Sequence, residues 1–182
     1  MKWGQKKYWP NILFRSGTNW YAYCASNPIC FVDGTGLESY VFYTTGENSD
    51  FTEQAEWKKE QLKMQGEDVV MIPVATVEDF VNGWDAMGEK DGESVNINYV
   101  EIYTHANPTT LIFSDGSSTE AINIKGTNSQ GGTIPKVEDL EEKPIDELNI
   151  YGCNAGNYLI YLYEGNNIAA EFSKKHKVFS DG

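Results

Sequence analysis

The residues best suited to covalent chemistry are one cysteine and one histidine, each placed directly after a run that predicts a strand. Cys153 lies in the segment Tyr151–Gly156 and follows the apolar run Leu148–Tyr151. His105, one of two histidines in the chain, follows the run Tyr99–Thr104. A thiol and an imidazole at two strand ends suggest a nucleophile and its base or acid.

Attack of a thiolate on a carbonyl also needs backbone N–H groups that stabilise the oxyanion. Gly152, Ala106 and Asn107 flank the two candidate residues, and a glycine lets backbone amides approach a reacting carbonyl without a Cβ in the way. Ser180 and Asp181 follow the last predicted strand and are candidates for a substrate pocket. An acidic residue in that pocket would suit Arg or Lys side chains.

Both catalytic candidates have a structural interpretation as well. A cysteine at a strand end can be a small buried apolar residue, and His105 can be a histidine whose hydrogen bonds are satisfied within the fold. The chain has three cysteines, which are too few for a disulfide framework or a four-cysteine zinc site, so free thiols and no metal or other cofactor are expected.

The charge of the chain is unevenly distributed. The formal net charge is -13 over 182 residues, yet residues 1–37 hold four cationic residues and one acidic residue. An acidic surface repels phosphate backbones, which argues against nucleic-acid partners and favours basic proteins or peptides. The sequence also contains no signal peptide and no apolar segment of membrane-spanning length, so a soluble domain without a membrane partner is expected.

The hydrophobic pattern from residue 38 onward alternates between strands and helices. Expected strands cover residues 39–44, 68–74, 99–104 and 148–151, with a final strand at 178–180; expected helices begin near residues 50, 76 and 167. A small hairpin is expected over residues 110–124 and a short acidic helix over 137–143. This order predicts an α/β fold, a mostly parallel sheet with helices on both faces. In such sheets, sites form beyond the carboxyl ends of the strands, where both His105 and Cys153 are expected.

The segment Asn19–Leu37 resembles the closing motif of the conserved core of Rhs (rearrangement hotspot) repeat proteins. It contains Tyr-Ala-Tyr-Cys, then Asn-Pro, then Asp-Gly-Thr-Gly-Leu in the order of that family; Ser26 and Gly34 stand where the family usually has Asn and Pro. The resemblance implies that residues 1–37, an irregular segment of strands and turns, end an Rhs-like core. It also implies a cleavage junction near Leu37 and Glu38.

By the same resemblance, residues 38–182 would be the variable toxin of a polymorphic toxin used in bacterial competition. Such a toxin is exported by a bacterial secretion system and acts in the cytoplasm of the target cell. Its implied partners are the Rhs shell and an immunity protein, besides a protein or peptide substrate.

Residues 38–182 also resemble the caspase-like (clan CD) cysteine peptidases, which share a parallel sheet, a His ending one strand and a Cys ending the next. The segment Ile150–Gly156 approximates their cysteine motif, while Ala106 follows His105 where the family usually has Gly. The resemblance implies a cysteine endopeptidase with a dyad of Cys153 and His105.

Two other functions remain open at the level of sequence. The first is a catalytically degenerate caspase-like module that binds a basic protein partner through its acidic surface. The second, a toxin acting on nucleotides or nucleic acid, has little support because the chain has no phosphate-binding glycine-rich loop, metal-ligand cluster or basic aromatic patch.

Overall fold

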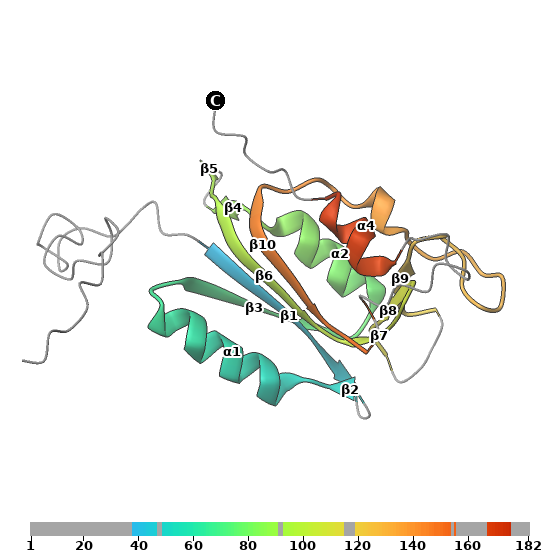
Figure 1. The fold of residues 1–182 in the computed structure, drawn as a ribbon, viewed down its shortest axis with the longest axis horizontal. Coiled ribbons are helices and arrows are strands. Elements are labelled where there is room, and N and C mark those ends of the chain that lie inside the picture. Colours follow the sequence, from blue (N-terminus) through green and yellow to red (C-terminus); the bar gives the residue numbers. More distant parts are fainter. Residues whose placement is uncertain are drawn as a thin grey trace, which may run out of the picture. The chain divides into compact units, whose positions relative to one another are not determined.

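The computed structural model describes residues 38–46, 49–90, 93–114, 119–153, 155 and 167–175, all of which belong to one compact unit within residues 36–182. They form an α/β fold with a mixed, mostly parallel sheet and helices (Figure 1). The elements are β1 (Glu38–Gly46), β2 (Ser49–Asp50), α1 (Thr52–Met64), β3 (Asp68–Val74), α2 (Val77–Ala86), β4 (Glu89–Lys90), β5 (Glu93–Ser94), β6 (Ile97–Tyr103), β7 (His105–Asn107), β8 (Thr110–Ile112), β9 (Ala121–Asn123), the 3₁₀ helix η2 (Val137–Asp139), β10 (Ile145–Tyr151) and α4 (Ile168–Ser173).

Four parallel strands form the main part of the sheet, in the spatial order β3, β1, β6, β10. The short strand β2 pairs antiparallel with β1. The connection from β1 to its neighbour β3 contains α1, and the connection from β3 to β6, on the other side of β1, contains α2. These two crossovers run in opposite directions along the sheet, and right-handed crossovers of opposite direction place their helices on opposite faces. Accordingly α1 lies on one face, and α2 and α4 lie on the other (Figure 1).

The alternation of side chains along β1 separates two apolar layers. Tyr40 and Phe42 belong to the larger core with α2 and α4, whereas Val41 packs with Ala55 and Leu62 of α1. Every second residue of a strand points to the same face, so one strand serves both layers. The sheet is therefore covered on both sides at β1.

Capping chemistry explains where the helices begin. Before α2, the Thr76 side chain accepts a hydrogen bond from the Asp79 N–H, and the Asp79 side chain accepts from the Thr76 N–H, which is a complete capping box. Before α1, which begins close to the expected residue 50, the Asp50 side chain accepts from the Thr52 N–H at 2.9 Å, and no capping box is present. Gly66 follows α1 with a φ of +94°, which a glycine adopts without strain.

Two of the expected helices are shorter in the structure. The prediction of an acidic helix over residues 137–143 is wrong beyond η2, because the backbone of Leu140 is extended and ends the helical turn. The following backbone makes tertiary hydrogen bonds instead: the Glu141 carbonyl accepts from the Trp84 side chain, and the Lys143 N–H donates to Lys175. The helix expected from residue 167 is present as α4, capped by Asn167, while the expected strand at 178–180 lies outside the described residues.

The expected hairpin is present as β8 and β9, and β7 joins it in a three-stranded antiparallel sheet. This small sheet begins at His105, two residues after the end of β6. Within the described ranges, no helix has the length and apolar character needed to cross a membrane.

Candidate active site

The two predicted catalytic residues occupy equivalent positions after two neighbouring parallel strands. The last register pair of β6 and β10 is Tyr103 with Tyr151, and His105 and Cys153 each follow two residues later. The Thr104 N–H donates to the Tyr151 carbonyl at 3.3 Å, so the pairing continues past the end of β6. Both residues therefore leave the sheet at the same edge.

A close contact between Gly152 and Ala106 joins these two strand ends. A Cβ added to Gly152 would lie 2.6 Å from the Ala106 Cβ and 3.1 Å from the Thr104 carbonyl oxygen. Only a residue without a side chain fits at this distance. The same added Cβ would lie 3.5 Å from the Ala106 amide nitrogen, so this amide is close to the backbone just before Cys153.

Cys153 is a free, exposed thiol. It lies in a turn that the Ala155 N–H closes by donating to the Gly152 carbonyl at 3.3 Å. The interpretation of Cys153 as a buried apolar residue is therefore wrong.

His105 is exposed as well, and its ring packs edge-on against Phe51, with 5.3 Å between the ring centroids and 72° between the planes. Phe51 immediately precedes α1, so the start of this helix sets the position of the imidazole. An aromatic edge-to-face contact of this kind favours one orientation of the ring.

The remaining sequence candidates have different surroundings. Asn107 uses its side chain locally, because its Oδ1 accepts from the Thr109 N–H at 2.9 Å. Ser180, Asp181 and Leu37 lie outside the described residues. Glu38 is buried at the start of β1, where its carboxylate accepts a hydrogen bond from the Tyr40 hydroxyl.

Two stacked tyrosines, which were not among the residues predicted for the site, each lie two residues before a candidate residue. The rings of Tyr103 and Tyr151 are parallel to within 9°, with centroids 4.4 Å apart. Burial raises the pKa of the Tyr103 hydroxyl, and the negative charges of Tyr151 and Glu101 raise it further. Burial and the Glu101 carboxylate also raise the pKa of Tyr151, which the Lys58 ammonium opposes. Because each tyrosine stands two residues before its candidate, their equal spacing in the sequence could have indicated that the two rings lie side by side on neighbouring strands.

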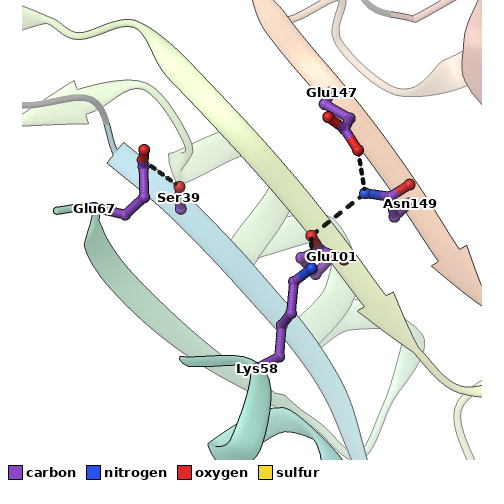
Figure 2. Close-up of polar contacts among 6 residues, drawn as sticks. All are labelled: Ser39, Lys58, Glu67, Glu101, Glu147 and Asn149. Atoms are coloured by element: carbon purple, nitrogen blue, oxygen red, sulfur yellow. Dashed lines mark hydrogen bonds and ion pairs between the residues drawn. The ribbon is translucent and has the colours of Figure 1, made fainter. Parts of the chain in front are cut away.

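A buried ion pair lies on the same face of β6. The Glu101 side chain is fully buried, and its Oε1 accepts from Lys58 of α1 at 2.8 Å and from the Asn149 side chain at 3.3 Å (Figure 2). Burial acts to lower the pKa of Lys58, but the pairing with Glu101 outweighs this effect and raises it. The Asn149 side chain also donates to Glu147 within β10 at 2.9 Å, so Asn149 bridges Glu147 and Glu101.

The described part of the chain contains no group of three or more His, Cys, Asp and Glu side chains that could hold a metal ion. The strand ends hold a thiol, an imidazole and the Ala106 backbone amide. Comparisons with protein-family models, with curated proteins and with solved structures found no match to this chain.

Proposed function

We propose that residues 38–182 are a cysteine endopeptidase domain that works through a dyad of Cys153 and His105. The observation that carries the proposal is the contact between Gly152 and Ala106, which brings the two strand ends together in register. An exposed thiol, an exposed imidazole and a nearby backbone amide are the groups that thiol-based acyl transfer requires.

The reaction would proceed in two acyl-transfer steps. His105 takes the thiol proton, and the Cys153 sulfur forms a bond to the carbonyl carbon of the scissile peptide while the carbonyl π electrons move to oxygen. His105 then gives the proton to the leaving nitrogen as the C–N bond breaks, which leaves a thioester on Cys153. Water, deprotonated by His105, hydrolyses the thioester and releases the thiol.

The amide of Ala106 is the first candidate for the oxyanion donor. It lies close to the backbone before Cys153, and the residue after the histidine has this role in the caspase-like peptidases that the chain resembles. The strand directions support this edge of the sheet, because ligands in open α/β sheets bind beyond the carboxyl ends of the parallel strands, where β6 and β10 both end.

The biological setting that we propose is that of a toxin delivered by an Rhs-like protein. It rests on the motif in residues 19–37, and it implies export from one bacterium and action in the cytoplasm of another. The substrate would be a protein of the target cell or the chain itself, and an immunity protein would protect the producing cell.

Replacement of the thiol tests the proposal. Cys153→Ala and His105→Gln are each expected to lower the cleavage of a peptide library by about 100-fold or more, since a positioned acid or base alone contributes roughly 10²–10⁴-fold. Both are also expected to abolish toxicity when the chain is expressed in a bacterial cytoplasm. Cys24→Ala and Cys30→Ala are the matched controls and should retain activity. Full cleavage by Cys153→Ala would overturn the proposal.

A second candidate function, a degenerate module that binds a basic protein, is favoured by the formal charge of -13 and by the alanine that follows His105. The reactivity of the thiol distinguishes the two. In an active dyad the imidazole stabilises the thiolate, so iodoacetamide should modify Cys153 faster at neutral pH than it modifies a free model thiol. Modification no faster than that of the model thiol would favour the binding module.

A further inference from the structure

We propose that the buried pair of Lys58 and Glu101 is a positioning device for His105, holding α1 at one register along β6 so that Phe51 fixes the imidazole. The inference rests on the proposed function of His105 as the base. Lys58 and Glu101 are positioning residues, because they act through α1 and Phe51 and do not contact the reacting atoms.

Glu101 occupies a buried position in β6. It stands two residues before Tyr103 and lies on the α1 face of the sheet, between Val100 and Ile102, which belong to the opposite core. The side chain is fully buried, and its Oε2 has no hydrogen-bond partner within the described residues. A charge in this position is costly unless it is paired, and Lys58 supplies the pairing cation.

Lys58 lies on the side of α1 that faces the sheet. Phe51, Ala55, Lys58 and Leu62 follow one another at helical spacing, so they share the stripe that faces the sheet. Ala55 and Leu62 are buried and Phe51 is half-buried, so Lys58 is the polar member of an otherwise apolar stripe. Figure 2 shows its side chain reaching from α1 to Glu101.

A buried ion pair can specify the relative position of two elements in a way that an apolar pair cannot. Well-packed apolar residues stabilise a core at least as well as a buried ion pair, whereas a buried polar pair can specify one register between packed elements. The Phe51 N–H donates to the Thr44 carbonyl at 2.9 Å, which ties the start of α1 to β1. The ion pair is a second point of attachment, seven residues further along the chain, and the two together set the orientation in which Phe51 packs against His105.

A double variant tests this role. Lys58→Met together with Glu101→Gln removes both charges and keeps the side-chain volumes. The imidazole Hε1 signal of His105 is then expected to move or split in the NMR spectrum, and His176→Gln assigns it because the chain has two histidines. In peptide cleavage, kcat is expected to fall by about 100-fold with KM unchanged, the cost of a displacement of about 1 Å. Lys58→Arg keeps the pair and is expected to retain the wild-type signal and kcat.

The results for the double variant distinguish a positioning role of the ion pair from a merely stabilising one. A folded double variant with the wild-type His105 signal and wild-type kcat would overturn the inference, even with a lowered melting temperature, because a merely stabilising pair would give that result. If the double variant does not fold, Phe51→Leu replaces it: a lowered kcat with unchanged KM supports the inference, and an unchanged kcat overturns it. The NMR signal requires no peptidase activity, so the positioning role can be tested even if the proposed function fails.

Discussion

At the scale of single residues, the contact between Gly152 and Ala106 is the point on which the candidate site depends. Gly152→Ala would place a Cβ 2.6 Å from the Ala106 Cβ, so the two strand ends must separate. We expect the free energy of unfolding to fall by about 1–3 kcal/mol, the usual cost of overpacking, and peptide cleavage to be lost. Urea unfolding and the peptide assay measure these effects.

The matched control adds Ala106→Gly to Gly152→Ala. It removes the Cβ–Cβ clash and leaves only the 3.1 Å contact with the Thr104 carbonyl oxygen, so part of the stability should return. If Gly152→Ala alone unfolds at the wild-type urea concentration and retains activity, the strand ends are not as close as the structure indicates.

From the raised pKa of the Tyr103 hydroxyl we predict how the free energy of unfolding changes in alkaline solution. Its pKa is raised in the folded protein, chiefly by burial, above the ordinary value of 10.0. The folded state therefore holds its proton at pH values where the unfolded state has lost it. This contribution to stability is fully present below pH 10 and is lost as the pH rises through the folded pKa.

Urea unfolding between pH 8 and pH 11, with tyrosinate absorbance as a second signal, measures this effect. Wild-type stability should decrease with pH over the upper part of that range, and Tyr103→Phe should make the decrease less steep. An identical pH dependence in the two proteins would contradict the assignment to Tyr103.

At the scale of elements, the start of α2 is the best-defined local structure. Thr76→Ala removes the side chain that accepts the Asp79 N–H, and we expect it to lower the free energy of unfolding by about 1 kcal/mol at neutral pH. Thr76→Ser keeps the hydroxyl and should stay close to wild type. Equal stability of the alanine and serine variants in urea would show that the cap contributes nothing.

Asp79, the other member of this capping box, makes the stability contributed by the cap depend on pH in acid solution. Burial acts to raise the pKa of Asp79, but hydrogen bonds from Thr76 and from the Ala75 N–H outweigh it and lower the pKa below 3.8. A lowered folded-state pKa gives stability that is present above the unfolded pKa and is lost as the pH falls through the folded value. The difference between Thr76→Ala and wild type should therefore shrink below about pH 4.

Much of this element structure could be predicted from the sequence. The apolar run at residues 68–74 coincides with β3, and the residues that end β6 and β10 follow from runs whose length and composition fit buried strands. The strand-end rule then predicted that His105 and Cys153 would lie at one edge. These predictions succeeded because they depend on local patterns and on the geometry of parallel sheets.

What the sequence analysis missed depends on contacts between distant segments. The stack of Tyr103 on Tyr151 requires the register between β6 and β10, and the pairing of Lys58 with Glu101 requires knowledge of which strand lies under α1. The extended backbone at Leu140 was missed for the same reason, since tertiary hydrogen bonds replaced the expected helix. A charged residue between two apolar ones, as at Glu101, was the available local signal.

At the scale of the whole molecule, the start of β1 determines how much of the N-terminal segment the α/β domain needs. β1 lies between β3 and β6, and its first residues are already part of the sheet: the Glu38 N–H donates to the Asn96 carbonyl at 3.3 Å, and the Ser39 hydroxyl donates to Glu67 at 2.8 Å (Figure 2). A cut at the proposed junction between Leu37 and Glu38 would keep every one of these contacts.

Two truncated chains test this boundary. The chain 38–182 is expected to unfold cooperatively in urea. The chain 40–182 lacks Glu38 and Ser39 and should be less stable by about 1–3 kcal/mol, because the buried Tyr40 hydroxyl loses its acceptor and the half-buried Glu67 loses a donor. Fluorescence of the buried Trp84 reports unfolding in both chains. Equal stability of the two chains would mean that β1 effectively begins after Ser39. Failure of 38–182 to fold would instead move the boundary toward the N-terminus, so that the segment resembling the Rhs core would contribute to the fold of the domain that follows it.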